Sequence, residues 1–206
     1  MQIRTKYFFA ALSLSATLLA GAAQGSVVYE IDVNTSSLPP GMTGYLDFQF
    51  DPGNTPFDAG SATITGFTTD GTLGAPLADV GAVSGTLPGP IVIDNTDATN
   101  EYTQAITYGS FFDVFVTLNI PLVSGSAAGG SSFTLDAEDS NFIPLLSSSF
   151  PAVEIDLNAT TGNSTVVNNT SGLASVNVVA PEPATFVLLG MGLALVAWRC
   201  RTARSS

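Results

Sequence analysis

The sequence contains no histidine, and its five lysine and arginine residues all lie among the first six or the last eight positions. Its single cysteine, Cys200, lies in the same C-terminal segment. Residues 26–180 therefore carry 16 aspartate or glutamate residues with no basic side chain and no cysteine among them. This separation of charge indicates that the two ends direct the chain to membranes and that the acidic middle is the exported part.

These absences exclude several kinds of chemistry from residues 26–180. Ser-His-Asp and Cys-His nucleophile systems need a histidine, and the usual zinc sites need histidine or cysteine. Without lysine there is no Schiff base and no phosphate-loop lysine, and without basic side chains direct nucleic-acid binding is electrostatically disfavoured. We therefore predict no enzymatic activity and no nucleic-acid partner. A glycoside hydrolase is the one enzymatic alternative, because that reaction needs only two carboxyl groups.

Residues 1–25 have the three-part layout of a secretory signal peptide. A short basic stretch precedes the uncharged run YFFAALSLSATLLA at residues 7–20, and small residues follow it. The run of 14 is shorter than the roughly 20 apolar residues that a membrane span needs. We predict a signal helix that engages the Sec translocon and is removed by signal peptidase before Ser26, with the small residues Ala23 and Gly25 at the cleavage site; a cut after Ala22 is the alternative. A buried N-terminal helix is the alternative.

The C-terminal segment combines a proline-rich motif, an apolar stretch and a basic tail. The motif is Pro181, Glu182 and Pro183, the stretch covers residues 184–198, and the basic residues are Arg199, Arg201 and Arg204. The arginines mark the cytoplasmic end of a transmembrane helix by the positive-inside rule. A helix over residues 184–198 is about 22 Å long, shorter than the roughly 30 Å hydrocarbon core. So short a span suits a temporary membrane stop; an ordinary tail anchor is the alternative.

This order of motif, short apolar helix and arginine-containing tail resembles the PEP-CTERM sorting signal of Gram-negative bacteria. The resemblance implies that residues 179–206 are the sorting signal and that exosortase, a membrane-embedded cysteine transpeptidase-like enzyme, recognises Pro181, Glu182 and Pro183 and removes the tail. It also implies an exported protein that is first an inner-membrane precursor, held by its C-terminal helix. After processing, the protein is expected at the cell surface or in the extracellular matrix.

Residues 26–178 are expected to form one acidic ectodomain built from strands. Short β-branched and aromatic runs alternate with turn residues, which is typical of an all-β fold. The predicted strands cover residues 26–33, 44–50, 62–69, 83–87, 91–93, 103–108, 111–120, 132–137, 152–157, 164–167 and 174–179. We predict an antiparallel β-sandwich of jelly-roll or Greek-key type. Residues 45–53 (YLDFQFDPG), 85–89 (GTLPG) and 131–136 (SSFTLD) are similar to the ectodomains of a PEP-CTERM family, which supports the sandwich and export to the surface.

The densest acidic cluster comprises Asp136, Glu138, Asp139 and Asn141. Calcium takes six to eight oxygen ligands from such groups, and we place the cluster at a strand-to-loop exit, where backbone carbonyls would join. The alternative is a solvated loop in which Asp and Asn cap turns. Apart from calcium, the sequence predicts no cofactor.

The expected function is structural or adhesive, in the exopolysaccharide matrix or on the outer surface. A carbohydrate-binding module is the first alternative; its available aromatic residues are Tyr29, Tyr45, Tyr102 and Tyr108, of which alternation places several in the core. The charge of the middle segment predicts resistance to self-association at low salt and tolerance of high salt, because salt screens the self-repulsion. It also predicts that divalent cations bridge the domain to anionic polysaccharide.

Overall fold

The computed structural model describes residues 26–53, 60–119, 130–148, 150–158, 161 and 163–179. The predicted signal helix and the predicted transmembrane helix lie outside these residues. The described part consists of strands, turns and bends, and it contains no helix that would be long and apolar enough to cross a membrane. The all-β prediction for the ectodomain is confirmed.

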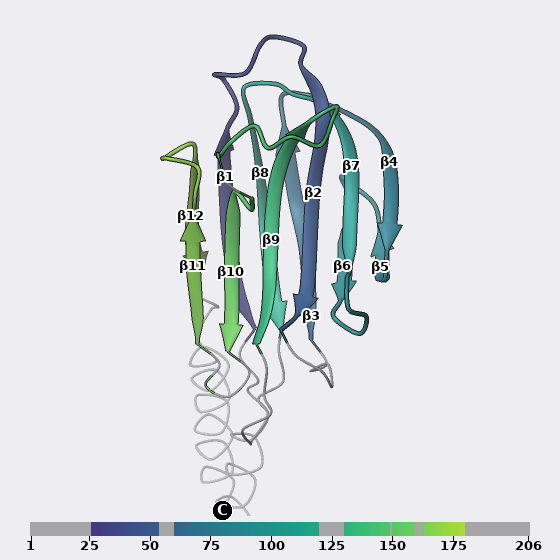
Figure 1. Ribbon diagram of the computed structural model, residues 1–206, viewed down its shortest axis with the longest axis vertical. Helices are drawn as coiled ribbons and strands as arrows, with labels where there is room; N and C mark the ends of the chain where they lie inside the picture. Colours follow the sequence, from purple (N-terminus) through teal and green to yellow (C-terminus); the bar gives the residue numbers. More distant parts are fainter. Residues whose placement is uncertain are drawn as a thin grey trace, which may run out of the picture.

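The strands form two antiparallel sheets of six strands each, which lie one behind the other in Figure 1. Sheet A has the order β12 (Ala174–Val179), β1 (Val27–Asn34), β8 (Phe111–Asn119), β3 (Ser61–Thr69), β6 (Ile91–Asp94) and β5 (Ala82–Gly85). Sheet B has the order β11 (Ser164–Asn168), β10 (Val153–Asn158), β9 (Gly130–Asp139), β2 (Thr43–Pro52), β7 (Glu101–Thr107) and β4 (Thr72–Val80).

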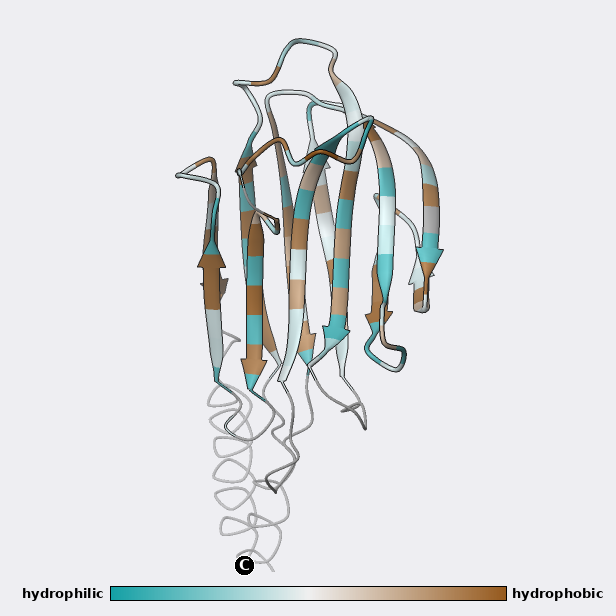
Figure 2. Ribbon diagram, in the orientation of Figure 1, coloured by the Kyte–Doolittle hydropathy of each residue, from teal (hydrophilic) through white to brown (hydrophobic). Residues whose placement is uncertain are grey.

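Alternating side chains divide each sheet into a buried face and an outer face. In β1, Tyr29, Ile31 and Val33 are buried while the residues between them are more exposed. Successive side chains of a strand point to opposite faces, and Figure 2 shows the resulting bands of apolar and polar residues along the strands. The buried faces of both sheets contribute to one hydrophobic cluster, in which Phe48 and Phe133 are among the largest fully buried side chains. The outer faces carry the polar and acidic residues.

Strand β4 is the one strand that the sequence did not predict. Its sequence TLGAPLADV contains Gly74 and Pro76, both poor strand formers. It lies at the edge of sheet B and pairs only with β7, with register shifts on both sides of Pro76. Proline is tolerated at such an edge because no ladder bond is needed on its outer side. Tertiary pairing with β7 therefore overrides a weak local preference.

Candidate functional site

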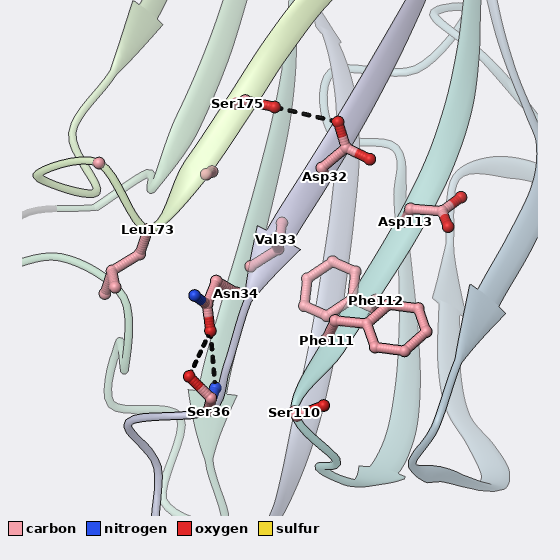
Figure 3. Close-up of a pocket in the computed structure, with 12 residues that line it drawn as sticks. Asp32, Val33, Asn34, Ser36, Ser110, Phe111, Phe112, Asp113, Leu173 and Ser175 are labelled. Atoms are coloured by element: carbon pink, nitrogen blue, oxygen red, sulfur yellow. Dashed lines mark hydrogen bonds between the residues drawn. The ribbon is translucent and has the colours of Figure 1, made fainter.

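A shallow groove of about 560 Å³ lies on the outer face of sheet A, over β12, β1 and β8 (Figure 3). Strand register brings its residues together: Asp32 is opposite Asp113, and Asn34 is opposite Phe111. On the other side of β1, Ser175 is opposite Asp32. Outward-facing residues of three strands that are separate in the sequence thus meet on one surface.

Hydrogen bonds hold the polar side chains around this groove. The Ser175 hydroxyl donates to Asp32 Oδ2 at 3.0 Å, and the Thr68 hydroxyl donates to Asp113 Oδ2 at 2.5 Å. The Phe111 side chain is 42% exposed beside these carboxylates. The groove therefore combines an exposed aromatic ring with hydrogen-bond acceptors. Small-molecule sites typically consist of an apolar surface with a few polar groups around it.

Sequence reasoning had considered only tyrosines as aromatic contact residues, and it missed Phe111. Tyr29, Tyr102 and Tyr108 are buried, as the alternation had predicted for several of the tyrosines. Tyr45 is half-buried on the outer face of sheet B and stacks on Phe142, with ring centroids 4.7 Å apart. The signal for Phe111 was present in the run FFDVFVTLN, where one set of alternate residues is fully apolar and the other set mixes Phe with Asp and Thr.

A second feature, which we call the carboxylate cluster, consists of Asp47, Glu101, Asp136 and Glu138 on the outer face of sheet B. Asp47 of β2 is directly opposite Asp136 of β9. Residues opposed in this way on antiparallel strands have Cβ atoms about 4.5–5.5 Å apart, and like charges there are destabilising. Asp47 is nevertheless only 6% exposed and Asp136 only 1% exposed.

The two opposed carboxylates have few hydrogen-bond partners. Asp47 Oδ2 accepts a bond from Gln49 Nε2 at 2.7 Å, and Asp136 Oδ1 accepts one from the Ala137 amide at 2.9 Å. Asp47 Oδ1 and Asp136 Oδ2 are buried, and neither has a hydrogen-bond partner among the described residues. Residues 26–180 contain no basic side chain, so this part of the chain supplies no cation to compensate the pair.

Burial is the main reason that Asp47, Asp136 and Glu138 resist ionisation. It raises the pKa of Asp47 to about 7, with a further increase from the charge of Glu101 and a decrease from the Gln49 hydrogen bond. Burial likewise raises the pKa of Asp136 to about 6, against hydrogen bonds from the backbone of Ala137 and Ala152. The pKa of Glu138 is also raised, first by burial and then by the charge of Asp136. Asp47 and Asp136 therefore titrate near neutral pH.

Tyr108 fixes the strand that carries Asp136 and Glu138. Its hydroxyl lies 2.6 Å from the Tyr45 carbonyl and 3.0 Å from the Glu138 carbonyl, both possible acceptors. The same oxygen accepts a bond from the Glu138 amide at 3.0 Å. Burial raises the pKa of Tyr108, so the hydroxyl stays protonated and able to donate. One side chain thus links the ends of β2 and β9 beneath the cluster.

The predicted position of the calcium candidates at a strand-to-loop exit is wrong for Asp136 and Glu138, which lie inside β9. The strand is two residues longer than predicted because Glu138 pairs with Tyr45, and Asp139 with Gly44. Asp139 ends the strand.

Asp139 and Asn141 belong to a turn. Asp139 Oδ1 accepts the amides of Asn141 at 2.7 Å and Ile143 at 3.0 Å. These bonds, first the one from Ile143, lower the pKa of Asp139, as in a capped turn. Among the described residues, no group of three or more His, Cys, Asp or Glu side chains is arranged to hold a metal ion, and calcium binding stays a prediction.

The predicted signal-cleavage residues Ala23 and Gly25 lie outside the described residues, as do the sorting-motif and arginine positions from Pro181 to Arg204. The last described strand, β12, ends at Val179. A family model described as the PEP-CTERM protein-sorting motif matches residues 179–201. The matched segment therefore begins where the last strand ends.

No curated protein and no solved structure is detectably similar to the chain. The sorting motif implies an exported protein that exosortase recognises and processes. This conclusion rests on residues 179–201.

Proposed function

We propose that the protein is a non-enzymatic structural or adhesive component of the cell surface or of the exopolysaccharide matrix. A signal peptide and the Sec translocon would export it, and exosortase would release it from the inner membrane. The proposal is based on the position of the sorting motif relative to the folded domain: the match starts at Val179, the last residue of β12. Removal of the tail would therefore leave the folded acidic domain as the working protein.

The strand orders support a jelly-roll-like sandwich as the form of this domain. In sheet A, β1, β8, β3 and β6 are consecutive neighbours, and in sheet B, β2, β7 and β4 are consecutive neighbours. The first five strands of the chain, β1 to β5, thus alternate between the sheets, and so do β6 to β9, as in a jelly roll. A domain of this kind holds its surface residues on a rigid frame, which suits a scaffold.

Adhesion would depend on cations that the protein does not itself supply. The outer faces carry exposed carboxylates such as those of Asp32 and Asp156, and calcium prefers oxygen ligands of this type. We propose that divalent cations compensate the acidic outer faces and bridge them to anionic polysaccharide.

The sorting step is tested by replacing Pro181, Glu182 and Pro183 together with alanine. We expect the tail to remain uncut and the full-length protein to accumulate in the inner membrane, as seen by fractionation and intact mass. Thr202→Ala, in the tail but outside the motif, is the control and should be processed normally. Normal trimming of the triple variant would contradict the proposal.

A second candidate function, glycan recognition, is favoured by the groove on sheet A. Phe111 offers a half-exposed ring, and Asp32 and Asp113 offer acceptors for sugar hydroxyls on the same surface. We expect Phe111→Ala to reduce retention of the protein in polysaccharide affinity gels. Phe142→Ala removes a ring of similar exposure, 52%, from the turn after β9 and is the control. Equal retention of both variants and the parent protein would rule out the groove as the binding surface.

A further inference from the structure

The two sheets have unpaired edges on opposite sides of the molecule, and the two sides differ. One side is formed by β4 and β5, and the other by β11 and β12, which lie at the right and left of Figure 1. An edge strand presents unpaired backbone donors and acceptors that can pair with another chain. Proteins prevent such pairing with proline, charge, bulges or very short edge strands.

The β4 and β5 side carries all of these protective features. Strand β4 contains Pro76, two register shifts and the exposed residue Asp79. Strand β5 is only four residues long. The sequence therefore discourages pairing along this side.

The side formed by β11 and β12 has no proline, charge or bulge, and its only protective feature is that the two strands are fairly short. The sequences STVVN and ASVNVV contain no charged residue, no proline and no glycine. Their pairings with β10 and β1 run without a register shift. Within the described residues, no strand pairs with the outer side of either one.

This side also leaves the apolar layer between the sheets open. Val166 is paired with Ile155, and Val178 with Tyr29, two residues that are fully buried. Paired residues point to the same face of a sheet, so both valines are on the core-facing side. Val166 is nevertheless 39% exposed and Val178 is 60% exposed. Exposed apolar surface of this kind marks an interaction site.

The distribution of acidic residues over the strands indicates what binds to the edge formed by β11 and β12. Of the twelve described strands, only β3, β5, β11 and β12 lack an acidic residue; β3 lies inside sheet A and β5 is very short. A second copy of the same polyanion is repelled at its acidic faces, because it has no basic residue between positions 26 and 180 to offer them. The edge formed by β11 and β12 is therefore the surface on which two copies meet with the least repulsion.

We propose that the edge formed by β11 and β12 binds the same edge of a second copy of this chain. A two-fold axis perpendicular to the sheets places β11 antiparallel to its equivalent and β12 antiparallel to its equivalent, so that both sheets continue across the interface. Such an isologous contact buries the same patch on both copies. The exposed valines of each copy then close the apolar layer of the other.

Disulfide trapping in the purified full chain tests this pairing. In a Cys200→Ser background, Val167→Cys places a thiol on β11, and Val80→Cys places one on β4 with similar exposure, 44% against 37%. Under mild oxidation at about 0.15 M salt, where charges are screened beyond ~8 Å, we expect a covalent dimer from Val167→Cys and not from Val80→Cys. Equal cross-linking of both variants would show association through the tail or by chance collision, and would overturn the proposal.

A blocking substitution provides the second arm. Val178→Lys alters a side chain that is mostly exposed in the single copy, so folding should be retained. Added to Val167→Cys, it should reduce the dimer at least about tenfold, equivalent to ~1.4 kcal/mol, because two lysines would face each other in the interface. A dimer yield that Val178→Lys leaves unchanged, or a cross-link only to proteins of other mass, would refute a second copy as the partner.

Discussion

The substitution Asp47→Asn should stabilise the domain at neutral pH and leave it nearly unchanged in acid. Asp47 has an ordinary pKa of 3.8 in the unfolded chain and a pKa of about 7 in the fold, chiefly because it is buried. Between these values the folded protein keeps a proton that the unfolded chain has released. Folded proteins that bind more protons than the unfolded chain lose stability as pH rises. The penalty is therefore absent well below pH 3.8 and complete above pH 7.

The size of the effect follows from the difference between the two pKa values. Each pKa unit corresponds to about 1.4 kcal/mol, so a rise to about 7 sets an upper limit of roughly 4 kcal/mol. Asparagine has nearly the same shape, and its carbonyl oxygen can still accept the Gln49 hydrogen bond. Part of the rise comes from neighbouring carboxylates that share protons, and we therefore expect a gain of about 2–4 kcal/mol at pH 8 and less than about 1 kcal/mol at pH 4.

Thermal unfolding of the purified full chain, followed by circular dichroism, measures this gain. For a protein of this size it corresponds to a rise in Tm of roughly 5–15 °C. Asp156→Asn is the matched control, because Asp156 is exposed on strand β10 of the same sheet, and it should change stability by less than about 0.5 kcal/mol. A gain for Asp47→Asn that is the same at pH 4 and pH 8, or that is missing at pH 8, would refute the argument from buried charge.

Three further predictions concern the same face. Asp136→Asn should also stabilise the domain above the Asp136 pKa of about 6. In denaturant unfolding, the Asp47→Asn/Asp136→Asn double variant should gain less free energy of unfolding than the sum of the two single variants, because each substitution already relieves the repulsion on the other aspartate. Full additivity would show that the two aspartates do not interact. Tyr108→Phe should lower the free energy of unfolding by about 1–3 kcal/mol, because it leaves the buried Glu138 amide without this partner; an unchanged midpoint in urea would contradict this. Millimolar calcium should raise Tm at pH 8 and not at pH 4, since protonated carboxyl groups do not bind the cation; no change at either pH would argue against cation compensation.

The sequence predicted those features that are encoded locally. Strand β8 was predicted because the run FFDVFVTLN combines β-branched and aromatic residues, and the strand that includes Phe48 and Phe50 was predicted from alternation. Strand β4 was missed because its preference for a strand comes from pairing with β7 and not from TLGAPLADV itself. Local pattern thus predicts the central strands better than an edge strand that depends on a partner.

The candidate site illustrates the same limit for side chains. Counting acidic residues along the chain singled out Asp136 to Asn141 as one cluster, yet the strand places Asp136 and Asp139 on different faces. The actual neighbour of Asp136 is Asp47, which β2 brings from a distant part of the chain. No spacing in the sequence marks this pair, because register between strands is a property of the whole sheet. Likewise, the half-exposed state of Phe111 follows from its position on the outer face of sheet A.

A protein segment without any basic residue has to stabilise its carboxylates by other means, and the fold uses two. Asp70 accepts hydrogen bonds from the hydroxyl and amide of Ser110 and from the amide of Phe111, which lower its pKa. Hydrogen bonds from the Ile143 and Asn141 amides lower the pKa of Asp139 in the same way. Asp47 and Asp136 lack such bonds on one oxygen each and are buried instead, so their pKa values rise. The first group therefore stays charged, whereas the second takes up protons near neutral pH. Protons and divalent cations would then compete for the oxygens of Asp47 and Asp136, so compensation of this pair by cations should weaken as the surroundings become acidic.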